Sequence, residues 1–388
     1  MNKKNSKLFL VLLLAVLSAF GPFVVDLYLP ALPQLAEFFA TSASMTQLTL
    51  TTAMVGLALG QLLFGPISDK FGRKKPLLIS LLIYIVSTVA IVFSPNIETM
   101  IALRIVQGLS SAGSVVISRA VAADLYQGRE MTQFFGLLMT INGLAPIISP
   151  VLGSVLLEYM SWKGIFAFLT LIGVVVAAFS LRLHESLPPE KRQQGSTFAS
   201  FASFGSILKN RRFMGYVWIE SLLFGAMFAY IAASPFILQS VYGLSAFAFS
   251  LCFAANGAAL VIGSNRGGRL AEHTALRVGV FGFVLAVAYT VAVLLLQAHW
   301  LWVEIGFFVT LLMVGIPLPA LSSLAMESER RYSGAASAIL GCMPFLLGGI
   351  ISPLVGLGDI FVATAIAMAA CAALVLLVYR GVKSYQAA

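Results

Sequence analysis

The sequence predicts an all-α membrane protein with twelve transmembrane helices in two six-helix halves. Three observations support this prediction. Hydrophobic residues make up 60% of the 388-residue chain and charged residues only 10%, which is far outside the range of soluble domains. The apolar runs are continuous over about 20 residues, as helices that cross a bilayer require, whereas the strands of a membrane barrel alternate apolar and polar residues. The longest polar stretch, residues 184–212, lies near the middle of the chain.

The first half comprises residues 1–183. Its opening apolar run, "LFLVLLLAVLSAF", has no small-residue cleavage site after it, so we interpret it as a retained span rather than a signal peptide. Charged or turn-rich residues separate this span from the next five. The expected helix cores are 7–36, 44–68, 75–94, 98–123, 131–158 and 162–183.

The second half, residues 213–388, follows the polar linker 184–212. A weak echo relates the halves, because "VGLALGQLLFG" in span two and "NGAALVIGSNRGGRL" in span eight place Gly65 and Gly263 at matching helix ends. Duplicated halves are typical of secondary transporters, although small residues also serve simply to pack helices closely. The expected cores are 213–241, 245–270, 275–298, 300–326, 333–353 and 357–380.

The basic residues predict the orientation. Almost all of the 24 Lys and Arg residues fall in segments that share one side of the membrane, and Lys163 is the one that falls in a loop on the other side. By the positive-inside rule we expect both termini and the linker in the cytoplasm.

Nothing in the sequence points to a cofactor. Cys252, Cys342 and Cys371 lie in apolar runs without the spacing of metal ligands, and the G-x-x-x-x-G-K-[ST] pattern of ATP-binding loops is absent. The net charge of +9 is dispersed among short loops rather than gathered in a patch. We expect no cofactor, no metal and no nucleic-acid partner.

The loop after span two reads "GPISDKFGRKKP", from Gly65 to Pro76. Glycines allow a tight turn there, Asp69 is an anion at a helix end, and the basic residues hold the loop on the cytoplasmic side. The stretch resembles the signature that follows the second helix in the major facilitator superfamily. This resemblance implies the major facilitator fold and a loop that biases the conformational equilibrium during transport.

Three further stretches extend the resemblance. "LRIVQGLSSAG" is similar to the family's fourth-helix motif, and "NGLAPIISPVLGSVL" to its fifth-helix antiporter motif, although it departs from the usual G-P-x-x-G-G core. "DLYLPALP" resembles the first helix of the Bcr/CflA group of drug:proton antiporters. The residues expected in the conformational motifs are Gly65, Asp69, Gly72, Arg73, Asp124, Pro146, Pro150 and Gly153.

Asp26, in the stretch "FGPFVVDLYLP" of span one, is the first candidate for proton coupling. A carboxylate deep in the bilayer costs about 2.5–3.5 kcal/mol on an insertion scale, so we expect it to have a partner or a function. Helical rise places both Asp26 and Arg104 in the outer part of the membrane, and the resemblance implies that spans one and four are neighbours. We therefore expect contact between them, either as a static ion pair or as a pair that binds and releases a proton.

Polar and aromatic side chains at membrane depth are candidates for binding the substrate. Span four carries a small, polar face, which suits either a wet cavity or a close helix contact. Glu220 could pair with Arg211 or Arg212, or could act as a second proton site or a ligand for cations. The remaining candidates could instead pack against helices or face lipid. The expected set is Tyr28, Gln107, Asn142, Glu220, Phe228, Tyr230, Phe253, Asn256 and Met313.

These features together predict a proton-coupled efflux transporter, not an enzyme. The resemblance implies export of small hydrophobic drugs, such as phenicol-like antibiotics, by alternating access. An exporter of a purine, nucleoside or sugar is the alternative; a receptor or an intramembrane enzyme is less favoured, because no Ser/His or His/Asp cluster lies within the spans. The expected partners are the substrate, protons and the lipid bilayer, with the chain acting as a monomer.

Overall fold

The computed structural model describes residues 6–126, 128–192, 205, 207–329 and 333–387. Every regular element in this part of the chain is helical, which confirms the predicted all-α class. Ten helical spans in the described residues, three of them divided into shorter segments, are long and apolar enough to cross a membrane. The two other expected spans contain the apolar helical stretches Leu144–Tyr159 and Ala338–Leu354.

The chain divides into two compact units. Unit 1 joins Met1–Ala31 with Thr52–Ala199, and unit 2 joins Leu32–Thr51 with Ser200–Ala388. Hydrogen bonds attach the early segment of unit 2 to its later helices: Gln47 Nε2 donates to the carbonyl of Ala232, and Ser44 Oγ donates to the carbonyl of Pro353, both at 2.9 Å. The expected domain boundaries, 1–183, 184–212 and 213–388, stay a prediction.

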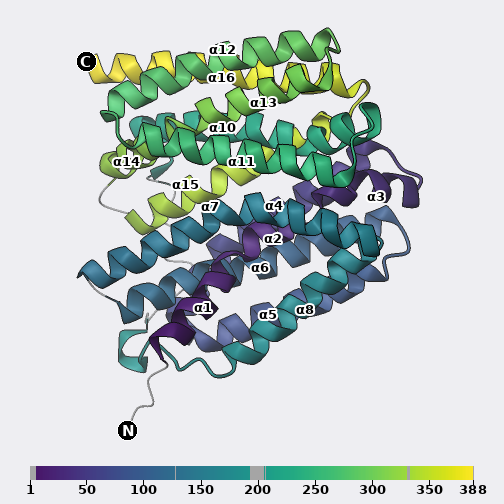
Figure 1. Cartoon of the computed structure of the whole chain (residues 1–388). Coiled ribbons are helices and arrows are strands. Elements are labelled where there is room, and N and C mark those ends of the chain that lie inside the picture. The colour runs from purple at the N-terminus through teal and green to yellow at the C-terminus, as the bar shows by residue number, and fades with distance from the viewer. Residues whose placement is uncertain (1–5, 127, 193–204, 206, 330–332, 388) are drawn as a thin grey trace. The chain divides into compact units, whose positions relative to one another are not determined.

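The helices of unit 1 follow the apolar runs of the first half (Figure 1). The first expected span consists of several short helices, and the later spans are continuous. The elements are α1 (Lys7–Ser18), α2 (Phe20–Asp26), η1 (Leu29–Ala31), α4 (Ala43–Phe71, whose first turns belong to unit 2), α5 (Lys74–Val92), α6 (Ile97–Leu125), α7 (Gly128–Tyr159), α8 (Trp162–Ser180) and η2 (Pro189–Lys191).

Unit 2 follows the apolar runs of the second half, with α3 added from the first. Its seventh and tenth expected spans are each divided into two helical segments. The elements are α3 (Leu32–Phe38), α10 (Arg211–Pro235), η4 (Phe236–Val241), α11 (Ala246–Gly267), α12 (Glu272–Leu295), α13 (Trp300–Gly315), α14 (Leu318–Ser328), α15 (Ser333–Leu354) and α16 (Ile360–Ala387).

Prolines explain why the first span is broken. A proline has no N–H to donate to the carbonyl four residues earlier, and its ring clashes with that carbonyl. Pro22 lies four residues after Ser18, where α1 ends, and Pro30 lies four residues after Asp26, where α2 ends. The sequence therefore places the end of a helix at the buried aspartate.

Glycines bring two pairs of helices close together. In unit 1, a side chain at Gly60 of α4 would collide with the carbonyl of Leu109 on α6. In unit 2, a side chain at Gly263 of α11 would collide with the carbonyl of Leu312 on α13. The second and fourth spans of each unit thus pack backbone to backbone. Gly65, which the sequence echo pairs with Gly263, meets only a side chain at an ordinary distance, so the close contact lies about one turn earlier in α4.

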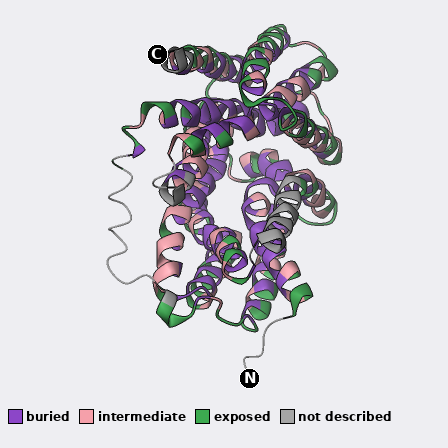
Figure 2. Ribbon diagram, turned by 90° about the vertical axis from the view of Figure 1, so that its left-hand side faces the viewer, coloured by how far each residue is buried: buried purple, intermediate pink, exposed green. Residues whose placement is uncertain are grey.

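Burial differs sharply between helices. In the most apolar 18-residue window of each span, 94% of the residues are buried for α10 with η4, against 39% for α12. Exposed residues, green in Figure 2, lie on the outward faces of the peripheral helices. They include large apolar side chains such as Leu285 on α12 and Ile366 on α16. Such faces suit contact with lipid chains, so α10 is the central helix of its unit.

Candidate functional site

Asp26 is the last residue of α2, at the point where the first span unwinds. Its side chain is buried, with 5% of its surface exposed. Among the residues that the structure describes, no side chain forms a hydrogen bond or ion pair with this carboxylate. A buried acid without a described partner at a helix break is unusual for a group with a purely structural role.

Arg104, on α6, binds the same helix break on either side of Asp26. Its Nη2 atom donates to the carbonyl of Val24 at 2.9 Å, which satisfies an acceptor in the last turn of α2. The guanidinium also lies over the ring of Tyr28, 4.2 Å from its centroid, and 5.7 Å from the ring centroid of Phe166 on α8. The direct contact that we expected between Arg104 and Asp26 is absent from the described interactions, because the guanidinium is engaged by a carbonyl and by aromatic faces.

On its other side, Arg104 begins a chain of hydrogen bonds whose other members are uncharged groups. Its Nη1 atom donates to Gln107 Oε1, and Gln107 Nε2 donates to the hydroxyl of Thr88 on α5 at 2.9 Å. Thr88 in turn donates to the carbonyl of Tyr84 at 2.6 Å. Arg104 and Gln107 are both fully buried. The arginine is therefore held in place by neutral groups while the Asp26 carboxylate stays available.

The fifth-helix motif reaches the same break. Gly153 of α7 lies where a side chain would collide with the carbonyl of Leu27, the residue after Asp26. Tyr28, Arg104 and Gly153 are thus brought together around Asp26, and Gln107 lies behind Arg104. The side chain of Asn142 lies outside the described part of the structure.

The loop after span two forms a second cluster, centred on Arg73. Its Nε and Nη2 atoms donate to Asp124 at 2.9 and 3.3 Å, and its Nη1 atom donates to Ser68 Oγ at 2.8 Å and to Asp69. Burial lowers the pKa of Arg73, but the hydrogen bonds and charges of Asp124 and Asp69 outweigh burial and raise it. The structure therefore joins three of the residues that the sequence singled out, with the arginine firmly charged.

Glu185, which follows α8, completes this cluster, although the sequence reasoning missed it. Its carboxylate accepts from the backbone N–H of Arg73 at 2.8 Å and from that of Lys74 at 3.2 Å. It thereby caps α5, whose N-terminus attracts an anion. Gly72, with a φ of +87°, makes the turn and leaves room for the carboxylate. The available signal was weak, because Glu185 is one of two acids, with Glu190, in the polar segment that follows span six.

A third cluster lies in unit 2 and joins three of its helices. Asn256 of α11 donates through Nδ2 to the hydroxyl of Tyr230 on α10 at 2.9 Å and to Glu304 Oε1 on α13 at 2.8 Å. Tyr230 stacks on Phe253, with ring centroids 5.6 Å apart. Sequence reasoning selected Tyr230, Phe253 and Asn256 but missed Glu304. Its signal was a lone acid in the apolar run "WLWVEIGFFV".

The other candidates of unit 2 lie apart from this cluster. Glu220 is buried on α10, about 15 Å along the helix from Tyr230, and it forms no ion pair with Arg211 or Arg212 among the described residues. Phe228 packs against Phe345 of α15. Met313 lies against Gly282 of α12. The aromatic and soft candidates of unit 2 are therefore divided among several contacts.

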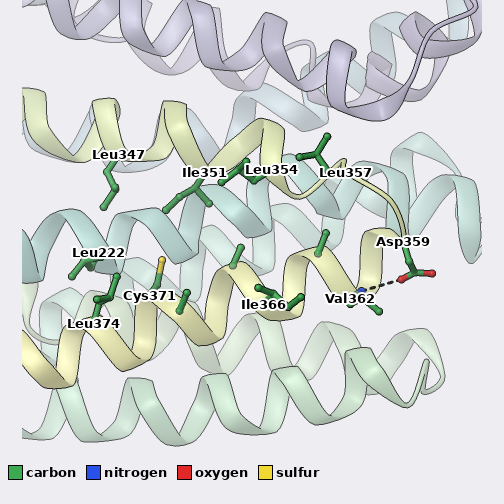
Figure 3. A pocket seen from close by; sticks show the side chains of 13 residues that line it. Leu222, Leu347, Ile351, Leu354, Leu357, Asp359, Val362, Ile366, Cys371 and Leu374 are labelled. Carbon is green, nitrogen blue, oxygen red and sulfur yellow. Dashed lines mark hydrogen bonds between the residues drawn. The ribbon is translucent and has the colours of Figure 1, made fainter.

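An apolar groove of about 520 Å³ runs between α10, α15 and α16 (Figure 3). Several of its large side chains, such as Leu357 and Ile366, are well exposed, so the groove opens on the outside of the unit. Its acidic residue, Asp359, accepts from the backbone N–H of Val362 at 2.9 Å and caps α16. The groove shares no residue with the polar clusters and has little with which to orient a polar substrate.

Comparison with known proteins assigns the family. Residues 8–353 match the Major Facilitator Superfamily. The uncharacterized MFS-type transporter YdgK of Bacillus subtilis (strain 168) is 40% identical over 362 residues, which cover 92% of this chain and 90% of the relative. The chloramphenicol resistance protein of Pseudomonas aeruginosa is 30% identical over 351 residues, 89% of this chain and 82% of the relative. The bicyclomycin resistance protein homolog of Haemophilus influenzae is 29% identical over 366 residues, 92% and 90% of the two chains.

Solved structures agree on the fold. The xylose transporter XylE from E. coli, in a partially occluded inward open conformation, matches with a TM-score of 0.74 over 95% of this chain and 96% of XylE. At 13% identity this likeness shows the fold alone. The family and the fold are those of transporters, which are not enzymes. The chain therefore belongs to the Major Facilitator Superfamily, and its resistance-protein relatives place it with the Bcr/CflA group.

Proposed function

We propose that the protein is a proton-coupled antiporter that exports small hydrophobic drugs across the bacterial inner membrane by alternating access. The observation that carries this proposal is the buried Asp26 carboxylate, which lies at a helix break and has no described partner. Its neighbour Arg104 is held by neutral groups, so Asp26 is free to bind a proton without leaving Arg104 unsupported. In this proposal both termini lie in the cytoplasm and one copy of the chain suffices.

The names of two relatives suggest the substrates. One relative is a chloramphenicol resistance protein and another is a bicyclomycin resistance protein homolog, at 30% and 29% identity. We take both drugs as the first substrates to test. The driving force is sufficient, because a single proton entering at 100 mV supplies about 2.3 kcal/mol, whereas a tenfold drug gradient requires about 1.4 kcal/mol.

Discontinuous helices are a common feature of transporter sites, because unwound backbone offers polar groups inside the membrane. Here Val24 and Asp26 lie in the last turn of α2 and Tyr28 lies in the break that follows it, and Arg104 and Gly153 approach the break from two other helices. A shift of α6 relative to the break would change the electrostatic surroundings of Asp26 and thereby its affinity for a proton. Coupling of this kind needs one titrating group and one moving charge.

Everted membrane vesicles test the proposal. With the lumen acidified, vesicles that contain the protein should accumulate radiolabelled chloramphenicol or bicyclomycin above the outside concentration. Nigericin together with valinomycin in K⁺ buffer, which removes both the pH gradient and the membrane potential, should abolish this accumulation. Vesicles without the protein serve as the control. Accumulation that persists after this treatment would contradict proton coupling, and no accumulation of either drug above the control would contradict the assigned substrates.

A further inference from the structure

The cluster of Tyr230, Asn256 and Glu304 contains two buried oxygen atoms that lack a hydrogen-bond donor within the described part of the chain. Asn256 and Tyr230 are almost completely buried, and Glu304 has 8% of its surface exposed. Asn256 Oδ1 and Glu304 Oε2 have no hydrogen-bond partner among the residues that the structure describes. Both atoms are acceptors. Because a carboxylate only accepts, the amide of Asn256 turns its nitrogen toward Glu304, and its oxygen has no donor among the described residues.

No basic side chain of these helices is close enough to donate a hydrogen bond to either oxygen. The Lys and Arg residues of α10, α11 and α13 are Arg211, Arg212 and Arg266, all at helix ends. Arg266 follows Asn256 by ten residues, or about 15 Å along α11. Leaving one oxygen of a buried carboxylate and a buried amide oxygen without donors is costly, so a donor from outside the chain would stabilise the cluster.

Aromatic rings give this cluster a preference for a cation. The ring of Tyr230 stacks on Phe253 and lies 4.9 Å from the ring centroid of Phe307. Aromatic faces attract ammonium groups, and a carboxylate adds a charge-assisted hydrogen bond. We propose that Glu304, Asn256 and Tyr230 form a binding site for the protonated amino group of a substrate.

The site is closed in this structure, because its polar atoms are buried. The inference rests on the proposed function in one respect: alternating access, which exposes buried sites in turn, would open this site to a substrate. It extends the proposed substrates from neutral drugs to amphiphilic amines. The amine would donate to Glu304 Oε2 and Asn256 Oδ1, while the apolar body of the substrate would rest on the aromatic rings.

Three probes that differ only at one group test the site. They are dansylcadaverine, which carries a primary amine, its N-acetyl derivative, which is neutral, and its trimethylammonium derivative, which is charged but has no N–H donor at that end. Affinity is measured by fluorescence with the purified full-length protein in detergent. We expect the amine to bind tightest. We expect Glu304→Gln to weaken amine binding by about tenfold or more and to leave the neutral probe within about twofold.

Two further variants control the measurement. Asp359→Asn removes an acid of the same unit but keeps the cap of α16, because asparagine caps helices as well as aspartate does; all three affinities should stay within about twofold. Glu304→Asp keeps the charge on a shorter side chain and should restore part of the amine affinity. If Glu304→Gln does not fold, Glu304→Asp carries the test, since it should weaken the amine more than the neutral probe.

The outcomes separate this inference from the proposed function. An unchanged amine affinity in Glu304→Gln, or an equal loss for all three probes, would overturn the site. Equal binding of the amine and the trimethylammonium probe would overturn recognition through hydrogen-bond donation. Amine binding that depends on Glu304, found together with vesicles that transport nothing, would support the site and contradict the antiporter proposal.

Discussion

At the scale of single residues, the contacts of Arg104 determine whether the Asp26 carboxylate can lose its charge without destabilising the protein. If the arginine depended on the carboxylate for neutralisation, removing the carboxylate would leave a buried charge without its partner, at a cost of about 3–5 kcal/mol. The described contacts of Arg104 instead include the carbonyl of Val24, the amide of Gln107 and the ring of Tyr28. Stability and coupling are thus separable at this site.

The Asp26→Asn variant tests this separation. Asparagine keeps the size and the polarity of the side chain but cannot titrate, so drug accumulation driven by a pH gradient should disappear. The melting temperature should stay close to that of the wild type, because Arg104 keeps its described contacts. Vesicle uptake and thermal unfolding of the same preparation provide the measurements.

Drug binding against pH completes the test of Asp26. In an antiporter the proton and the drug compete, so acidification should weaken drug binding by the wild type, whereas binding by the Asp26→Asn protein should not depend on pH in this way. Proton-coupled accumulation by the Asp26→Asn protein would exclude Asp26 as the carrier and move the proposal to Glu220. A large loss of stability would favour the static role.

At the scale of elements, the break in the first span is the feature that positions the site. Pro22 and Pro30 explain its position, but from the sequence we expected one helix over 7–36. Prolines alone do not predict a break, since Pro66 lies inside the continuous helix α4. The tight approach of α7 could not be predicted, because whether Gly153 contacts a lipid chain, a side chain or a carbonyl depends on the fold. The structure supplies this partner, the carbonyl of Leu27.

The Gly153→Ala substitution should therefore be destabilising. A methyl group at this position collides with the Leu27 carbonyl, and crowding of this kind costs about 1–3 kcal/mol. Gly21→Ala is the matched control, because a methyl group there meets side chains of Leu57 and Val115 at 3.8 Å. Thermal unfolding of both variants in the same detergent measures the difference. Equal melting temperatures would show that α7 does not press on the break.

The loop between α4 and α5 makes a second test at this scale. Asp69 has a half-exposed side chain and one described bond to Arg73, whereas Asp124 is more buried, holds Arg73 through two bonds and accepts from Ser186 at 2.8 Å. Asp124→Asn should therefore lower the melting temperature more than Asp69→Asn, by an amount that corresponds to about 1–3 kcal/mol.

The same two variants separate a structural role from a conformational one. Asp69→Asn should slow drug transport while leaving drug binding largely intact, because we expect the loop to bias the equilibrium between conformations rather than to contact the substrate. Transport rates and binding affinities on one preparation measure this. Unchanged transport by Asp69→Asn would remove this acid from the mechanism, and equal melting temperatures would contradict the ranking of the two aspartates.

At the scale of the whole molecule, the sequence predicts most of the fold and only part of the sites. Composition and apolar periodicity identify the helices, because the bilayer requires long apolar runs whatever their packing. Partners across helices are different. Glu185 and Glu304 acquire their significance only when a distant helix end or a buried amide is brought beside them. The grouping of residues 32–51 with unit 2 likewise depends on contacts that the sequence does not display.

The orientation of the chain in the membrane is a prediction of the same scale, and single cysteines test it. We choose Tyr159, Leu296, Lys75 and His273, which are all exposed, so that labelling reports the side of the membrane rather than burial. Cys252, Cys342 and Cys371 are first replaced by alanine to remove the background. In intact cells, a membrane-impermeant maleimide should label cysteines at Tyr159 and Leu296 and should reach those at Lys75 and His273 only after the membrane is opened.

The pattern of labelling distinguishes two kinds of error. Twelve spans with cytoplasmic termini place the ends of α7 and α12 outside and the starts of α5 and α12 inside, as the basic residues predict. Reversed labelling at all four positions would keep the number of spans and show that the predicted orientation is wrong. Reversal on one side of the polar linker only, at Leu296 and His273 but not at Tyr159 and Lys75, would mean that an odd number of spans precedes unit 2's later helices. In that case the predicted division into two halves of six helices each would be wrong.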